Sequence, residues 1–378
     1  MERDQATKFM FDLLGLLVSK KGSDLFITTD FPPAIKIDGK VMPISNQILT
    51  AAHTVELARS IMSDKQAATF EQTKECNFAI NPGSLGRFRV SAFMQLGRVG
   101  MVLRTITTEI PLIDDLGLPD VLKDIALEQR GLVLMVGATG SGKSTTLAAM
   151  VRHRNENSHG HIITIEDPVE FVHPNINCLI THREVGVDTD NWGVALKNSL
   201  RQAPDVIMIG EIRDRETMDY AIMFAETGHL CLATLHANSS NQALDRIVNF
   251  FPEDRRQQLL MDLSFNLKGM IAQRLIPLRD TKGRCAAVEI MLNSPYISDL
   301  VFRNQVHEIK EVMKKSRELG MQTFDQSLFD LFEADKITYE DALRHADSVN
   351  DLRLAIKLQG KDSKNRDLTA GTRHVGIL

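Results

Sequence analysis

The stretch GLVLMVGATGSGKSTTLAAMV, residues 131–151, constrains the fold more than any other part of the sequence. An apolar run that reads as a buried strand leads into a loop of glycines and small polar residues, and a helical segment follows. The loop matches the pattern G-x-x-x-x-G-K-[ST] at Gly137, Gly142, Lys143 and Ser144. Between a strand and a helix, this pattern predicts a phosphate-binding loop. A glycine-rich turn that binds no nucleotide is the alternative.

The predicted phosphate-binding loop comprises Gly137, Ala138, Thr139, Gly140, Ser141, Gly142, Lys143, Ser144 and Thr145. Its glycines let the backbone turn tightly and aim successive N–H groups inward. The start of the following helix adds partial positive charge where phosphates bind. Lys143 is expected to reach the β- and γ-phosphates of ATP, and the Ser144 hydroxyl to bind Mg²⁺. ATP and Mg²⁺ are therefore the predicted cofactors.

Short apolar runs alternate with helical segments in this part of the chain, namely GLVLMV, HIITIED, DVIMIG and HLCLATLH. Nearly continuous apolar runs bounded by helices are typical of a parallel sheet buried on both faces. We expect an α/β domain that binds its ligand at the carboxyl ends of the strands. From about residue 252 the pattern indicates mainly helices, with a break near Lys336.

The N-terminal part reads as a different fold class. Residues 8–19 form an expected amphipathic helix, and Asp38-Gly39 separates two alternating runs in the manner of a hairpin turn. A helix is expected over 51–70, and two strands should turn near Gly97. These elements predict an α+β domain with an antiparallel sheet.

The sequence predicts four segments. Residues 1–108 form the α+β domain, and 109–122 form a linker rich in proline and glycine. Residues 123–357 form the α/β domain with its C-terminal helices. The polar segment 358–378 is expected to be a flexible tail.

Acidic residues follow two of the predicted strands. Glu211 ends the strand in PDVIMIGEIRD, where a carboxylate beside the phosphate-binding loop can bind Mg²⁺ directly or through water. Glu166, Asp167 and Glu170 cluster in TIEDPVEF, and one of them is a candidate to orient the water that attacks a γ-phosphate. The alternative for the cluster is that Asp167-Pro168 only makes a turn.

Two histidines and two arginines complete the candidate site. His229 and His236 bracket the strand in GHLCLATLHAN, and both are candidates to face the nucleotide edge of the sheet. Structural histidines are the alternative. Arg89 and Arg104 lie on two neighbouring strands of the N-terminal domain, where an arginine can stabilise charge on a transferring phosphoryl group. A solvated strand face is the alternative there.

Bulk properties exclude several classes of protein. The net charge of −5 and the pI of about 6.1 argue against non-specific nucleic-acid binding. The N-terminus is no secretory signal, and no apolar run is long enough for a transmembrane segment. The four scattered cysteines favour reduced thiols in a cytoplasmic protein.

The motifs GATGSGKST, TIEDPVEF, LRQAPDVIMIGEIRD and TGHLCLATLHAN stand in this order in the chain. Together they resemble the secretion-ATPase superfamily of type II secretion and type IV pilus systems. The resemblance runs from GSDLFI to about residue 355, and its C-terminal part is most similar to the pilus-retraction ATPases of the PilT/PilU type. It implies a hexameric ATP-driven motor with a PAS-like N-terminal domain and a RecA-like C-terminal domain.

This resemblance also implies residue roles and partners. Gly137–Thr145 takes the Walker A role, Glu211 the Walker B role and Glu170 that of the catalytic base. The seven side chains with implied catalytic roles are Lys143, Glu170, Glu211, His229, His236, Arg89 and Arg104. The implied assembly is a homo-hexamer in the cytoplasm at the inner-membrane base of the pilus. A PilT-type ATPase and a PilC-type platform protein are its implied partners.

One stretch departs from the family pattern. Retraction ATPases of the PilT type carry the motif A-I-R-N-L-I-R-E, and the matching stretch here is YISDLVFR, residues 296–303. Only Ile297 and Leu300 agree with it. The departure places the chain nearer the accessory PilU type and leaves open whether it retracts a pilus without a partner ATPase.

Four other functions compete with this interpretation. A pilus-extension or type II secretion ATPase usually carries a longer N-terminal region and a tetracysteine zinc element, which are not visible in the sequence. A GTPase would carry an N/T-K-x-D motif after the loop, and none is found. A RecA-like DNA translocase would need a basic groove. A non-catalytic scaffold would not need an intact loop with acidic residues.

Overall fold

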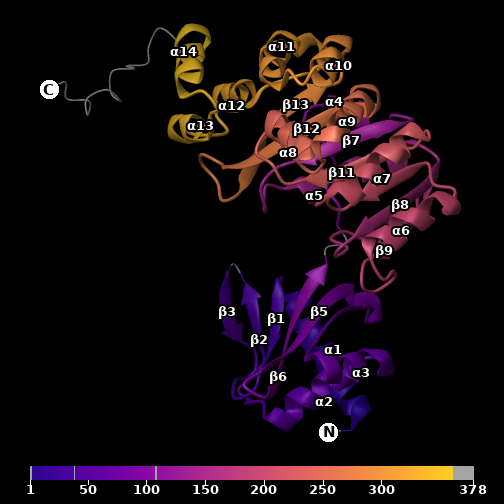
Figure 1. Cartoon of the computed structure of the whole chain (residues 1–378). Coiled ribbons are helices and arrows are strands. Elements are labelled where there is room, and N and C mark those ends of the chain that lie inside the picture. Colours follow the sequence, from indigo (N-terminus) through magenta and orange to yellow (C-terminus); the bar gives the residue numbers. More distant parts are fainter. Residues whose placement is uncertain (1, 38, 107–108, 361–378) are drawn as a thin grey trace. The chain divides into compact units, whose positions relative to one another are not determined.

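The structure, a computed structural model, describes residues 2–37, 39–106 and 109–360. The chain forms two compact units (Figure 1). The first unit contains residues 1–109 together with 167–173 and 182–191, and the second contains the rest. The domain boundaries given by the sequence stay predictions. Residues 107–108 and 361–378, at the predicted junction and in the predicted tail, lie outside the described residues.

An antiparallel sheet of six strands forms the centre of the first unit, in the order β3-β2-β1-β6-β5-β4. Its strands are β1 Asp24–Ile27, β2 Ala34–Ile37, β3 Lys40–Pro43, β4 Glu75–Ile80, β5 Arg87–Gln95 and β6 Arg98–Ile106. The two predicted hairpins are confirmed: β2 pairs with β3, and β5 pairs with β6 across a turn at Gly97. Gly97 has a φ of 74°, which an L-residue adopts at a cost. Asp38 of the first turn lies outside the described residues.

Three helices accompany this sheet: α1 Arg3–Ser19, α2 Ala51–Ile61 and α3 Asp64–Thr73. The helical stretch expected over roughly 51–70 consists of two helices, because the chain starts a new helix at Ser63. The Ser63 side chain accepts from the N–H of Gln66, and the Gln66 side chain accepts from the N–H of Ser63. This reciprocal cap is a helix-start signal that outweighs the continuous apolar spacing.

The second unit contains a sheet of seven strands in the order β13-β12-β7-β11-β10-β8-β9. Its strands are β7 Gly131–Val136, β8 Gly160–Glu166, β9 Cys178–Glu184, β10 Val206–Ile209, β11 Leu230–Leu235, β12 Leu267–Pro277 and β13 Arg284–Leu292. The strands β7, β11, β10 and β8 run parallel, as the four apolar runs predict, and β12 adds a fifth parallel strand beside β7. The predicted class, an α/β domain joined to an antiparallel α+β domain, is confirmed.

Six helices belong to the first part of this unit: α4 Val121–Ala126, α5 Lys143–Asn157, α6 Trp192–Ser199, α7 Arg215–Glu226, α8 Ser240–Asn249 and α9 Glu253–Asn266. Five more, here called the C-terminal helices, are α10 Pro295–Phe302, α11 Ile309–Lys315, α12 Phe324–Glu333, α13 Tyr339–His345 and α14 Val349–Gln359. Figure 1 shows α11–α14, coloured orange to yellow, gathered beside the β12–β13 hairpin. The predicted helix break near Lys336 is confirmed between α12 and α13.

The mainly helical region expected after residue 252 is only partly right. Strands β12 and β13 form an antiparallel hairpin at the edge of the sheet, and β12 also pairs with β7 in parallel. Helix α9 passes into β12 at Asn266–Leu267 with no glycine or proline between them. Because nothing punctuates this junction, apolar spacing alone does not reveal where the helix ends and the strand begins.

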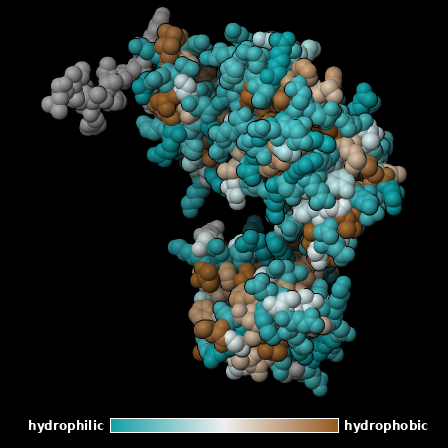
Figure 2. Space-filling model, in the orientation of Figure 1, coloured by the Kyte–Doolittle hydropathy of each residue, from teal (hydrophilic) through white to brown (hydrophobic). Residues whose placement is uncertain are grey.

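Apolar side chains concentrate inside each unit. All six residues of β7 and all six of β11 are buried, so the middle of the parallel sheet is covered on both faces. The face drawn in Figure 2 is mainly hydrophilic, with apolar residues in small separate groups. Among the described residues, no helix is long and apolar enough to cross a membrane.

Candidate phosphate-binding and hydrolysis site

The phosphate-binding loop leaves the buried strand β7 at Gly137 and enters α5 at Lys143. Gly140 and Gly142 have φ angles of 77° and 88°, a region that favours glycine. A Cβ atom at Gly137 would lie 2.3 Å from Ser141 Oγ, so a larger residue does not fit there. The three loop glycines are thus required by backbone conformation and by close packing.

The polar groups of this loop suit an anion. Lys143 Nζ folds back and donates to the carbonyls of Gly137 at 2.7 Å and Ala138 at 2.9 Å. Ser141 Oγ is buried and lacks a hydrogen-bond partner among the described residues. Helix α5 begins at Gly142 without a side-chain cap, which leaves the positive end of its dipole for a ligand. The loop therefore offers an ammonium, a hydroxyl and a helix N-terminus to a phosphate.

Gln273 of β12 braces this loop from the neighbouring strand. Its Nε2 donates to the carbonyl of Ser141 at 2.9 Å, and its Oε1 accepts from Thr146 Oγ1 at 2.8 Å. A Cβ atom at Gly142 would lie 2.6 Å from the same Nε2. The buried amide thus contacts both the loop and the first turns of α5. The sequence analysis missed this residue.

Glu211 and His236 lie together at the carboxyl edge of the sheet. The strands β10 and β11 that precede them are parallel neighbours, so both residues emerge at the same edge. Glu211 Oε1 lies 3.2 Å from His236 Nε2, and Glu211 Oε2 accepts from Arg213 Nε at 2.8 Å. Glu166, which ends the adjacent strand β8, is also buried at this edge. Glu166, Glu211 and His236 therefore lie at one edge of the sheet, and their roles toward a nucleotide stay predictions.

Burial and charge set the protonation of this edge. Burial lowers the pKa of Lys143, while the Glu211 carboxylate acts in the opposite direction. Burial also lowers the pKa of His236, and the positive charge of Lys143 lowers it further, against the effect of Glu211. His236 is therefore neutral near pH 7, and its ring contacts the Glu211 carboxylate.

His229 lies at the opposite edge of the sheet, so the expectation that it faces the nucleotide edge of its own chain is wrong. Its carbonyl accepts from the N–H of Gly131, at the start of β7. Its ring lies against Thr227 Oγ1 at 3.0 Å and the carbonyl of Phe224 at 3.2 Å. The six residues of β11 separate it from His236, a span of about 20 Å. A role for His229 outside its own chain stays a prediction.

A surface hollow of about 520 Å³ opens beside the loop and His236. Ala138, Asn238, Arg246 and Phe250 are among the residues that line it. The Arg246 guanidinium lies over the Phe250 ring, 5.8 Å from its centroid. The hollow gives a ligand access to the tip of the loop, where residues 138–140 are exposed.

The segment that contains Glu170, residues 167–173, belongs to the first unit. Glu170 is exposed and follows the end of β8 by four residues. Its neighbour Val169 donates its N–H to Glu184 Oε2 at 3.2 Å, and Arg87 Nη2 lies 3.5 Å from the same oxygen. Burial raises the pKa of Glu184, and these two donors act against that effect. The catalytic role of Glu170 stays a prediction.

Arg89 and Arg104 face each other across β5 and β6 in the first unit. The register pairs Arg89 directly with Arg104, and it pairs Arg104 with Asp24 of β1 on its other side. Arg104 Nε donates to the buried Asp24 carboxylate at 2.7 Å. Directly opposed like charges cost stability in a sheet. Asp24 supplies a compensating negative charge beside this pair, and the role of Arg89 and Arg104 toward a nucleotide stays a prediction.

Comparison with known proteins identifies the family. The family model described as "Type II/IV secretion system protein" matches residues 7–336. The chain belongs to this family. It is 58% identical over 365 residues to the Type IV pilus ATPase PilU of Pseudomonas aeruginosa, covering 97% of this chain and 95% of that protein. The resemblance inferred from the four motifs is thereby confirmed.

Two further relatives connect the family to retraction. The chain is 40% identical over 335 residues to the Type IV pilus retractation ATPase PilT of the same organism, covering 89% of this chain and 97% of that protein. The crystal structure of the pilus retraction motor PilT with bound ADP has a TM-score of 0.84 and 36% identity. It covers 90% of this chain and 97% of that one.

Gln273 stands as the clearest residue that sequence reasoning missed. The signal was a single amide in the otherwise apolar run GMIAQRLIP, residues 269–277. That run falls in the region predicted to be mainly helical, and on a helix the amide has no fixed relation to the phosphate-binding loop. Once β12 is placed beside β7, the register puts Ala272 opposite Val136 and brings Gln273 to the level of the loop.

Proposed function

We propose that this chain is an ATP-hydrolysing motor of the type IV pilus that powers pilus retraction and twitching motility, as the accessory PilU-type ATPase. The observation that carries the proposal is the 58% identity to a type IV pilus ATPase over nearly the whole chain. The loop chemistry supports it independently, because Lys143, Ser141 and the start of α5 suit a phosphate.

Each group at the loop has a proposed task in binding ATP and Mg²⁺. Lys143 exchanges its two carbonyl partners for the β- and γ-phosphates, and the N–H groups of the loop donate to the same phosphates. Ser144 and Glu211 are the residues that would hold Mg²⁺, directly or through water. The metal supplies charge neutralisation of the phosphates when it is bound. His236 keeps the Glu211 carboxylate oriented toward the loop.

Hydrolysis needs groups that the first unit carries. Glu170 is the proposed base that orients the attacking water. Arg89 and Arg104 are the proposed arginines that stabilise charge on the γ-phosphoryl group. Since the family resemblance implies that these arginines approach nucleotide in an assembled ring, we propose a homo-hexamer as the active form. Closure of the ring on ATP and its release would convert hydrolysis into movement.

The proposed place of action is the cytoplasmic side of the inner membrane, against a PilC-type platform protein. The proposed accessory role rests on helix α10, which carries the departure from the PilT motif. Ile297 and Leu300, the two residues that agree with the motif, are buried, at 0% and 1% exposed. Tyr296 and Phe302, which differ from it, are 54% and 41% exposed. The helix thus keeps its packing and changes its surface, so we propose a PilT-type ATPase as partner.

Steady-state hydrolysis of ATP tests the enzymatic part of the proposal. The wild-type chain should release phosphate in the presence of Mg²⁺ and lose this activity with a chelator. Lys143→Ala should lower kcat by at least about 100-fold, because it removes a charge that stabilises the transferring phosphoryl group. Wild-type turnover in Lys143→Ala would sink the proposal.

The length of surface pili tests the direction of the motor. A host strain that lacks this chain should keep its pili and retract them less. Loss of pili in that strain would favour the alternative, a pilus-extension or type II secretion ATPase. Stimulation of hydrolysis by DNA would instead favour a RecA-like translocase.

A further inference from the structure

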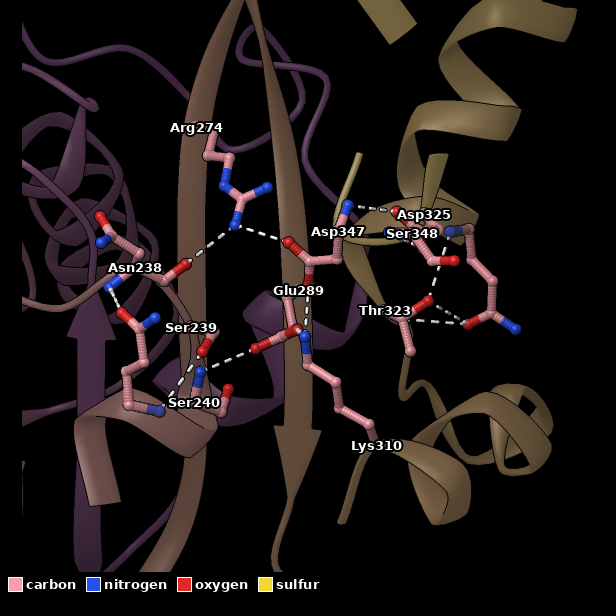
Figure 3. A network of polar contacts seen from close by, with 12 residues as sticks. Asn238, Ser239, Ser240, Arg274, Glu289, Lys310, Thr323, Asp325, Asp347 and Ser348 are labelled. Atoms are coloured by element: carbon pink, nitrogen blue, oxygen red, sulfur yellow. Dashed lines mark hydrogen bonds and ion pairs between the residues drawn. The ribbon is translucent and has the colours of Figure 1, made fainter. Parts of the chain in front are cut away.

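Two consecutive residues of β12 leave the strand on opposite faces, as neighbours on a strand do. Gln273 contacts the phosphate-binding loop through Ser141 and α5 through Thr146. The next residue, Arg274, turns away from the loop. Figure 3 shows Arg274 between Asn238 on one side and Asp347 on the other. A single strand thus carries one residue for the nucleotide loop and one for another part of the unit.

Both terminal nitrogens and the plane of the Arg274 guanidinium contact the C-terminal helices or the segment between them. Its Nη1 donates to the carbonyl of His345 at 2.6 Å, at the end of α13. Its Nη2 donates to Asp347 Oδ1 at 2.8 Å, just before α14. The guanidinium carbon lies 3.9 Å from the centroid of the Phe324 ring at the start of α12. Arginine suits this position because its planar fork can stack and donate at the same time.

A network of charges continues from Asp347 (Figure 3). Lys310 of α11 contacts Asp347 and also lies 3.9 Å from Glu289 of β13, which is fully buried. Burial acts to raise the pKa of Asp347, but Lys310 and Arg274 outweigh it and hold the pKa below its usual value. The Asp347 N–H donates to Asp325 Oδ1 of α12 at 2.7 Å. The network therefore fixes α11, α12 and α14 to the β12–β13 hairpin.

The same network extends to the carboxyl edge of the parallel sheet, where Glu211 and His236 lie. Arg274 Nη2 lies 3.2 Å from the carbonyl of Asn238, two residues after His236. Glu289 Oε1 accepts from the N–H of Ser240 at 2.7 Å, at the start of α8. The loop that joins His236 to α8 is thus held by β12 and β13. Any shift of residues 237–239 must therefore be shared by β12, the strand whose Gln273 contacts the phosphate-binding loop.

We propose that Gln273 is a positioning residue for the phosphate-binding loop, and that Arg274 beside it couples this loop to the C-terminal helices. The inference rests on the proposed function, since it assumes that the loop binds a nucleotide. When the loop closes on phosphate, Ser141 and Thr146 shift together with Gln273, because both are bonded to its amide. Arg274 moves with the same backbone and transmits the shift to α12, α13 and α14. The C-terminal helices thereby respond to the presence of nucleotide.

The binding of ADP to the full chain tests the role of Gln273. Gln273→Glu keeps the size of the side chain and its acceptor but removes the donor to Ser141. Its Kd for ADP should rise at least about tenfold, because a buried hydrogen bond is lost and a negative charge is added near the phosphates. Its KM for ATP should rise by a similar factor while kcat stays within about threefold, because the loop holds ground state and transition state alike. Gln273→Met, which keeps the length without a polar group, is the second variant if Gln273→Glu does not fold.

Gln322→Glu is the matched control for this test. Its amide also donates to a backbone carbonyl, that of Val288 at 2.9 Å. Val288 lies on β13, one strand further from the phosphate-binding loop than Gln273. The control should bind ADP within about twofold of wild type. Equal ADP affinity in the Gln273 variants and the control would overturn the positioning role. If the wild-type chain binds no ADP while it is folded, the proposed function itself fails, which distinguishes the two results.

Hydrogen exchange tests the coupling. In the wild type, saturating ADP should slow amide exchange of residues 339–359 by at least about threefold. In Arg274→Lys, which keeps the charge and loses the fork, ADP should still bind but leave exchange of that segment unchanged. Gln322→Glu should behave as wild type. An unchanged exchange rate in ADP-bound wild type, or a full response in Arg274→Lys, would overturn the coupling.

Discussion

The two sheets of this protein place functional side chains in different ways. In the parallel sheet, Gly137, Glu166, Glu211 and His236 all lie at the carboxyl end of a strand, so the topology brings them to one edge. In the antiparallel sheet, Arg89 and Arg104 lie within their strands and meet only through the register of β5 and β6. The end of a strand can be predicted from the sequence. Which residues of two strands lie opposite each other depends on how the strands pair. The comparison predicts which substitutions matter and how.

Loss of an arginine of the antiparallel sheet should have the largest effect. Arg104→Ala should lower kcat by about 1,000-fold, because an arginine that meets the γ-phosphoryl group stabilises charge that develops in the transition state. The Kd for ADP should change less than about threefold. Both are measured by steady-state hydrolysis and by ADP titration.

The controls for this prediction lie on the same sheet. Arg98→Ala removes another arginine of β6, which pairs with the exposed Asp30, and should leave kcat unchanged. Arg104→Lys keeps the ion pair with buried Asp24 while it loses the fork, so it separates stability from catalysis. Equal losses of kcat and ADP affinity in Arg104→Ala would show that the arginine is not a transition-state group.

Neutralising the carboxylate at the edge of the parallel sheet should come next. Glu211→Gln should lower kcat by about 100-fold, because it removes the charge that faces Lys143 and the proposed Mg²⁺ site. Glu216→Gln, at an exposed position in the first turn of α7, is the matched control. An unaltered Mg²⁺ dependence of hydrolysis in Glu211→Gln would contradict the metal role.

Acid should weaken the first unit through a buried histidine. His173 is 5% exposed, and burial, with His182 beside it, lowers its pKa from 6.5 to about 3. Between these values the unfolded chain binds more protons than the folded one, so stability falls as pH falls. The free energy of unfolding should drop by about 2 kcal/mol from pH 7 to pH 5 on account of this residue. Urea unfolding at both pH values measures it.

His173→Gln should remove most of that pH dependence. His307→Gln, at a side chain 79% exposed, is the control and should keep it. A drop of the same size in wild type and in His173→Gln would assign the acid sensitivity to other groups.

The two histidines that flank β11 allow the two edges of the parallel sheet to be compared on a single strand. His236→Asn should raise the Kd for ADP or lower kcat by about tenfold, because it removes a polar contact that positions the Glu211 carboxylate. His229→Asn lies at the other edge and should change ADP binding less than about twofold. An equal effect of the two variants on ADP binding would contradict the assignment of the nucleotide edge.

The sequence predicted the elements whose signals are local. The strand, loop and helix around Gly137–Thr145, the hairpin turn at Gly97 and the parallel strands could be read from glycines and apolar runs. The break between α2 and α3 could have been read too, since Ser63 and Gln66 form a capping box that apolar spacing obscured.

The remainder depended on tertiary pairing. Strand β12 follows α9 with no breaking residue, and only its pairing with β7 and β13 makes it a strand. Gln273 became recognisable as part of the site once that pairing placed its amide beside Ser141. His229 differs from Gln273 in this respect, because its place before β11, at the amino edge of a parallel sheet, follows from the strand direction alone.

Hydrolysis per subunit as a function of protein concentration tests the central claim most directly. If the first unit of one chain completes the site of another, the specific Mg²⁺-dependent ATPase activity should rise steeply with concentration as the ring assembles. Lys143→Ala should stay inactive throughout, and sizing at each concentration should show the hexamer where activity appears. Constant specific activity from a monomer to a ring would contradict a site completed by assembly.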